Sequence, residues 1–237
     1  MRRLISGTSL AMIWMAGTAF AGPVADFESE FREMYADYRT ALFMTNSGNR
    51  EKSGASLKAL GAGWSAIKLG YATTPPPQYE DDPQWGEVIA EVDALLAEAG
   101  AEVSAGELVE AHDTLEGVRE VFSALHLRNG VQTFSDRMNA YHAEMEHVLA
   151  IDPATVTKAD LPGLTGQAAV LAYLADEVAA HPPAEAREDE TFAKLLKALQ
   201  DSVQALNVAA RAGDIEALRA AMAGLKKPYS KLFLKFG

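Results

Sequence analysis

Residues 108–125 read LVEAHDTLEGVREVFSAL, and this segment decides the fold class. Its apolar side chains recur every three or four residues, at Leu108, Ala111, Leu115, Val118, Phe122 and Leu125. That spacing places them on one face of an α-helix. The same spacing recurs in residues 27–42 and 88–99, and no alternating pattern typical of a β-strand competes with it. The chain is therefore predicted to be all-α, with helices that bury one apolar stripe.

Helix-breaking residues divide the first half of the chain. Breaks are expected at Asn46–Asn49, Pro75–Pro77, Gly100 and Asn129-Gly130. They leave four amphipathic helices between residues 27 and 127, which suits an up-down-up-down bundle.

An internal repeat appears at a constant offset of 107 residues, and it needs no gap. Loop prolines, glycines near helix starts and core aromatic residues all coincide. The matched pairs are Phe27 with Phe134, Leu42 with Leu149, Pro75-Pro76 with Pro182-Pro183, Trp85 with Phe192, Gly106 with Gly213, Leu108 with Ile215, Gly117 with Gly224, Phe122 with Tyr229 and Leu125 with Leu232. We therefore predict two tandem four-helix bundles, over residues 22–128 and 131–237.

The joint between the copies is short. Arg128-Asn129-Gly130 suits the end of a helix, because Asn and Gly tolerate the left-handed conformation that ends helices. The joint favours two antiparallel neighbouring helices over one long rod.

Residues 1–21 have the pattern of a cleaved signal peptide. Arg2 and Arg3 precede an apolar run over residues 10–16, and Ala19-Phe20-Ala21 offers a cleavage site. The expected location is the periplasm. The run is too short to span a bilayer, and no later segment is apolar enough to do so.

Charge and composition indicate which classes of molecule this chain could bind. Removing residues 1–21 takes away two arginines and no acids, which lowers the net charge from −12 to −14. An acidic surface disfavours nucleic acid and anionic lipid, and it favours a metal ion or a basic partner protein. The absence of cysteine excludes disulfides, thiolate metal sites and covalently attached haem.

Three features are similar to a known family. They are the start Ala25–Glu30, the Pro-Pro connection followed by the acidic loop Glu80–Pro83, and a final helix led by Gly106 with Ala111, Leu115, Arg119 and Phe122 at matching spacing. Each copy thereby resembles cytochrome b562, a periplasmic four-helix haem protein. The resemblance covers about 100 residues per copy.

That family holds haem b between a Met on its first helix and a His near the end of its fourth. Carried over to this chain, the Met position falls on Phe31 and Met138, and the His position falls on Ser123 and Ser230. Neither copy keeps the pair. The resemblance therefore implies the scaffold and argues against the family's haem site.

A first candidate site lies just after the joint. Met138, His142 and Met145 follow i, i+4, i+7 spacing, which puts them on one helix face. Thioether and imidazole ligands suit copper, Cu(I) above all. The alternative is that the two methionines are ordinary core residues.

A second candidate site combines both sides of the joint. His112 and Glu116 are spaced i, i+4, as are His142 and Glu146. In an antiparallel hairpin each His would lie level with the Glu of the other helix. Two imidazoles and two carboxylates could bind iron, zinc, manganese or Cu(II). Exposed i, i+4 pairs that merely stabilise helices are the alternative.

The sequence contains no phosphate-binding loop and no nucleophile motif, so a non-enzymatic protein is expected. Three functions follow from these patterns. The first is periplasmic binding of copper or iron at the joint, and the second is a helical adaptor that binds another protein without metal. The third is an electron carrier that holds haem b in a manner different from the family's.

Overall fold

A computed structural model describes residues 22–237, so the predicted signal peptide lies outside the described residues. Within this range all regular structure is helical, which confirms the all-α prediction. None of the helices in these residues has the length and apolarity needed to cross a membrane. The elements are α1 (Pro23–Asn46), α2 (Arg50–Tyr71), η1 (Pro77–Tyr79), α3 (Trp85–Ala105), α4 (Leu108–Arg128), α5 (Phe134–Leu149), η2 (Pro153–Thr155), α6 (Leu161–Ala180), η3 (Ala184–Ala186), α7 (Glu190–Ala212), α8 (Ile215–Gly224) and α9 (Lys226–Phe236).

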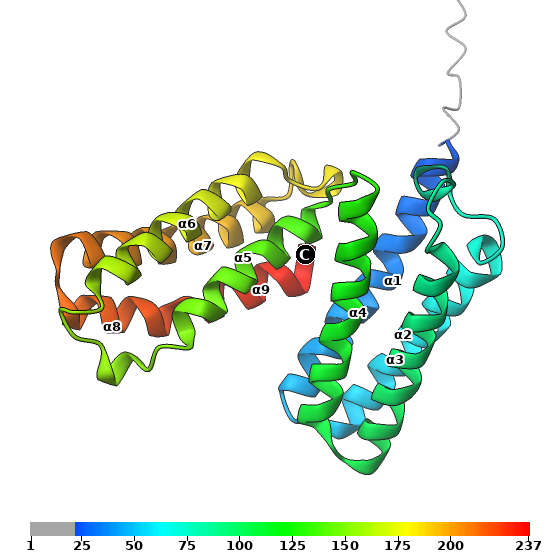
Figure 1. Ribbon diagram of the computed structural model, residues 1–237, viewed down its shortest axis with the longest axis horizontal. Coiled ribbons are helices and arrows are strands. Elements are labelled where there is room, and N and C mark those ends of the chain that lie inside the picture. Colours follow the sequence, from blue (N-terminus) through cyan, green and yellow to red (C-terminus); the bar gives the residue numbers. More distant parts are fainter. Residues whose placement is uncertain (1–21) are drawn as a thin grey trace, which may run out of the picture.

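Helices α1 to α4 form one bundle (Figure 1). Its interior is rich in aromatic side chains. The predicted breaks near Asn49 and Pro75–Pro77 are confirmed; the Asn49 side chain caps α2 by accepting a hydrogen bond from the Lys52 amide. The predicted break at Gly100 is wrong. Helix α3 continues to Ala105 and ends at Gly106, whose φ of 90° is the left-handed conformation that glycine adopts without strain. A lone glycine inside an apolar helix costs too little to end it.

Helices α5 to α9 form a second bundle. Its fourth member is interrupted, because α8 ends at Gly224 and α9 starts at Lys226. Pro228 explains the interruption, since its nitrogen carries no hydrogen to donate to the carbonyl of Gly224.

Several element boundaries recur at the offset of 107 residues. The short helices η1 and η3 start at Pro77 and Ala184, and Gly106 and Gly213 both cap their helices in the left-handed conformation. The helices that follow start at Leu108 and Ile215. These coincidences support the predicted duplication, which stays a prediction.

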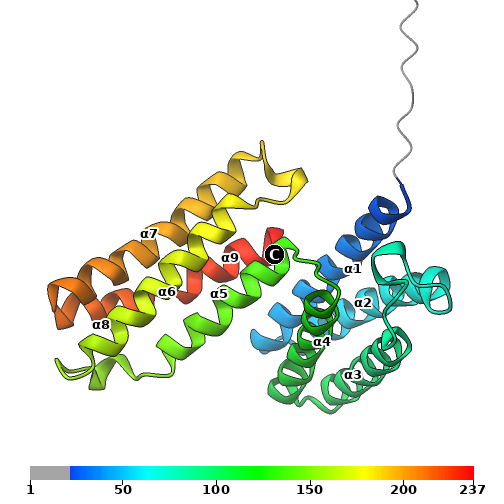
Figure 2. The same cartoon turned by 45° about the horizontal axis from the view of Figure 1, so that its top comes forward.

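The expected antiparallel pair across the joint is wrong. Helices α4 and α5 are separate, but they do not pack along their lengths, and they run in clearly different directions (Figures 1 and 2). Gly130, at a φ of 66°, turns the chain. Asp136 then accepts a hydrogen bond from His126 Nδ1 at 2.9 Å, and together with Thr133 it caps the start of α5. A short connection limits only the distance between two helix ends. The direction of α5 depends on contacts elsewhere.

Those contacts lie between α1 and α9, which pack side by side across the two bundles. Arg39 of α1 is only 8% exposed, and its guanidinium donates to the backbone carbonyls of Leu234, Lys235 and Gly237 at the end of α9. A positive charge at the carboxyl end of a helix satisfies its unpaired carbonyls and opposes its dipole. Arg39 therefore ties the second bundle to the first.

Replacing Arg39 with Met is expected to lower the free energy of unfolding by about 2–4 kcal/mol, because buried carbonyls lose their donors. It should also raise the radius of gyration in small-angle X-ray scattering as the bundles separate. The matched control is Arg50→Met, since Arg50 donates in the same way to Val103 and Ser104 but within the first bundle. Arg50→Met should lose less unfolding free energy than Arg39→Met and should keep the wild-type radius of gyration. An Arg39→Met protein with unchanged radius would contradict this role.

Candidate functional site

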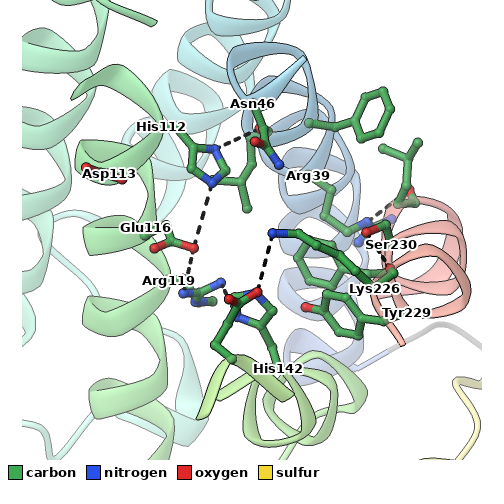
Figure 3. A pocket seen from close by; sticks show the side chains of 15 residues that line it. Arg39, Asn46, His112, Asp113, Glu116, Arg119, His142, Lys226, Tyr229 and Ser230 are labelled. Atoms are coloured by element: carbon green, nitrogen blue, oxygen red, sulfur yellow. Dashed lines mark hydrogen bonds and ion pairs between the residues drawn. The ribbon is translucent and has the colours of Figure 1, made fainter. Parts of the chain in front are cut away.

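A cavity of about 320 Å³ lies where α1, α4, α5 and α9 meet (Figure 3). We call it the interbundle cavity, since both bundles contribute to its walls. Its lining includes three carboxylates, three cationic side chains and two imidazoles, namely Asp113, Glu116, Glu146, Arg39, Arg119, Lys226, His112 and His142. Charged groups of both signs therefore face one small space.

His112 enters this cavity from α4. Its Nδ1 lies 3.1 Å from the carbonyl oxygen of Leu42 and 3.3 Å from Thr45 Oγ1. Because a carbonyl only accepts, the neutral ring carries its proton on Nδ1. The other nitrogen, Nε2, is left with a lone pair and lies 3.9 Å from Glu116 Oε1.

Arg119 links the two bundles through the cavity. One guanidinium nitrogen lies 3.1 Å from Glu116 Oε1 on its own helix, and another lies 3.3 Å from His142 Nδ1 on α5. Its side chain is only 13% exposed. Its spacing from Glu116 is visible in the sequence, but its contact with His142 depends on where α5 lies. Sequence reasoning therefore missed it as a site residue.

His142 is held in the neutral state. Its ring stacks on Tyr229 of α9 at 5.0 Å, and its Nε2 lies 3.3 Å from Glu146 Oε1. Burial and the positive charge of Arg119 lower the pKa of His142 below its ordinary 6.5, and Lys226 adds a smaller lowering. Together they outweigh Glu146 and Glu116, whose negative charges raise this pKa. Since Arg119 donates to Nδ1, the proton of the neutral ring lies on Nε2, toward Glu146. Nδ1 of His142 is thus already engaged, whereas Glu146 Oε1 has no hydrogen-bond partner among residues 22–237.

The structure brings together four of the six residues predicted as a metal site. His112, Glu116, His142 and Glu146 all line the interbundle cavity. Each histidine ring lies beside the glutamate of its own helix, with Nε2–Oε1 distances of 3.9 Å for His112 and Glu116 and 3.3 Å for His142 and Glu146, whereas the sequence predicted pairing across the joint. The cross-helix pairing depended on the antiparallel hairpin, which does not form.

Met138 and Met145 lie elsewhere. Both are fully buried in the core of the second bundle and do not line the cavity. Across residues 22–237, no group of three or more His, Asp or Glu side chains is arranged to hold a metal ion. The cavity instead surrounds its carboxylates with Arg119 and Lys226, the latter 3.5 Å from Glu146 Oε1.

The positions that correspond to the haem ligands do not fit haem b. In the first bundle, Phe31 packs against Phe122 at 4.9 Å between ring centroids and against Tyr35 at 5.8 Å, so aromatic rings fill the interior. In the second bundle, Met138 is a core residue, and the hydroxyl of Ser230 donates to the carbonyl of Lys226 in its own helix at 2.8 Å.

The lowered pKa of His142 predicts a pH-dependent stability. Its folded pKa lies below the unfolded value of 6.5, so the unfolded chain takes up more protons between the two values. Stability should therefore be complete above pH 6.5 and fall as the pH drops below it, by at most about 1.4 kcal/mol per pH unit for one proton. The free energy of unfolding, measured with urea between pH 7.5 and 5.5, should decrease less in His142→Gln than in the wild-type protein. The control is His147→Gln, whose side chain is 71% exposed on the same helix. An equal dependence of the free energy of unfolding on pH in all three proteins would refute the lowered pKa of His142.

No protein-family model, curated protein or solved structure matches this chain.

Proposed function

We propose that this chain is an exported, non-enzymatic binding protein, and that its interbundle cavity takes a small zwitterionic molecule. The observation that carries the proposal is the charge of the lining, where two ion pairs, Glu116 with Arg119 and Glu146 with Lys226, share one cavity built by both bundles. A ligand with one charge of each sign would find a partner for both.

The two ion pairs in the cavity differ in exposure. Glu146 and Lys226 have side chains that are 42% and 55% exposed, whereas Glu116 and Arg119 are 32% and 13% exposed. An ammonium group of the ligand would pair with Glu146 or Glu116, and a carboxylate would pair with Lys226 or Arg119. Exposed ion pairs contribute little to stability, so exchanging the outer pair for ligand contacts costs little. A ligand with a single charge would leave the opposite protein charge unpaired, which is unfavourable in a partly buried site.

The orientation of His112 favours a second candidate, a divalent or copper ion bound by His112 and Glu116. In metal-binding histidines, the ring nitrogen that does not face the metal commonly donates its hydrogen to a backbone carbonyl, as Nδ1 of His112 does to Leu42. The neighbouring charge of Arg119 opposes a cation at this position, which is why we rank the metal second.

Binding of 4-aminobutanoate, measured by isothermal titration calorimetry, tests the first candidate. It should bind at least tenfold more tightly than butanoate or butylamine, which each carry one of its two charges. Lys226→Gln and Glu146→Gln should each weaken binding at least tenfold. Lys227→Gln, which alters an exposed neighbour outside the cavity, should not. Equal affinity for all three compounds would overturn the zwitterion proposal.

The metal candidate is tested by titrating the same proteins with Cu²⁺, Fe²⁺ and Zn²⁺. Metal binding should be lost in His112→Gln and retained or strengthened in Lys226→Gln, because the latter removes a competing positive charge. Binding that survives His112→Gln would exclude the metal site. A protein that binds neither metals nor small molecules would favour the helical adaptor.

A further inference from the structure

A second and larger hollow lies between the bundles. It has a volume of about 820 Å³ and is bounded by α1, the α4–α5 joint, the start of α5, the α6–α7 connection and the end of α9. We call it the basic groove. It gathers five cationic side chains (Arg32, Arg39, Arg137, Arg187 and Lys235) against two carboxylates (Glu28 and Glu185). This excess is unusual in a chain whose net charge is −12.

One inner cation, Arg137, is hydrogen-bonded mainly to neutral groups. It donates to the carbonyls of Gln132 and Thr133 at 3.2 and 3.1 Å. The buried Nε of Arg137 has no hydrogen-bond acceptor within residues 22–237, and Glu177 Oε2 lies 4.0 Å away. Carbonyl contacts satisfy the hydrogen atoms of a guanidinium but do not neutralise its charge, and the long ion pair with Glu177 compensates that charge only weakly.

The outer cations are loosely held. Arg32 and Glu185 are 3.8 Å apart and more than half exposed, and Lys235 lies 3.7 Å from Asp189. Arg187 forms no ion pair with any residue that the structure describes. Long, exposed ion pairs of this kind are easily exchanged for contacts with a ligand.

Aromatic surface lies beside these charges. Phe31, Tyr35, Phe134 and Phe236 contribute to the walls of the groove, and Lys235 lies 4.9 Å above the ring of Phe236. Ligand-binding clefts typically combine such an apolar wall with a few placed polar groups, at volumes of about 300–1,000 Å³.

We propose that the basic groove binds a small amphipathic anion, with an aromatic or other apolar body and a carboxylate or phosphate group. The acidic group would pair with Arg187, Lys235 and the weakly compensated guanidinium of Arg137, and the apolar body would contact Phe134 and Phe236. A polyanion such as nucleic acid is disfavoured, because it would extend beyond the groove over an acidic surface.

The probe that tests this is 1-naphthyl phosphate, with inorganic phosphate and 1-naphthol as its two halves. Calorimetry should show at least tenfold tighter binding of the whole probe than of either half. The double variant Arg187→Gln/Lys235→Gln should weaken binding at least tenfold. Arg211→Gln, an exposed change on α7, should leave it unchanged. A probe that binds no better than 1-naphthol, or equally well to the double variant, would overturn the proposal.

Amide chemical shifts locate the bound probe. Shifts caused by 1-naphthyl phosphate should concentrate in residues 131–137 and 182–187, and shifts confined to the walls of the interbundle cavity would overturn the assignment. Lys226→Gln should bind the probe as wild type does, so this result stands independently of the proposed zwitterion site. Arg39 is avoided as a test because it lines both hollows.

Discussion

The contact between the Arg39 guanidinium and the carboxyl end of α9 is the interaction on which the arrangement of the two bundles depends. It joins residues almost 200 positions apart, and it is buried. Because α9 also packs on α5 and α7, anchoring its end on α1 sets the direction of the whole second bundle. The two hollows lie on either side of this contact, and Arg39 contributes to both. Any ligand that changes the spacing of α1 and α9 would therefore affect both hollows.

Electrostatic compensation differs between the hollows. In the interbundle cavity Arg119 and Lys226 are paired with carboxylates, and His142 stays neutral because burial and Arg119 disfavour its charge. In the basic groove Arg137 donates to carbonyls and its carboxylate partner lies 4.0 Å away, so its positive charge is only weakly compensated. A balanced site suits a ligand that carries both signs, and an unbalanced site suits an anion. The same chain thus offers two chemically distinct places between its bundles.

The breaks near Asn49, Pro75–Pro77 and Asn129-Gly130 were predicted correctly because helix ends depend on local hydrogen bonding, such as the cap that Asn49 provides for α2. Gly106, Gly213 and Pro228 also act through groups within a few residues, but the helix ends at these glycines and the interruption at Pro228 were not predicted. Gly100 was misread as a break, because the packing of α3 outweighs the small cost of one glycine. The candidate site was partly predicted as well. His112, Glu116, His142 and Glu146 do share a cavity, whereas Met138 and Met145 belong to the core.

The helical class, three of the four breaks predicted up to the joint and the concentration of histidine and glutamate near the joint follow from the sequence alone, since periodicity and capping act over one or two helical turns. The direction of α5, the placement of Arg119 between Glu116 and His142, and the clustering of cations from α1, α5, the α6–α7 connection and α9 in one groove depend on tertiary packing. These features arise from contacts between residues far apart in the chain. A short joint such as Arg128–Gly130 restricts where the next helix begins, but packing energies far from the joint decide where that helix points.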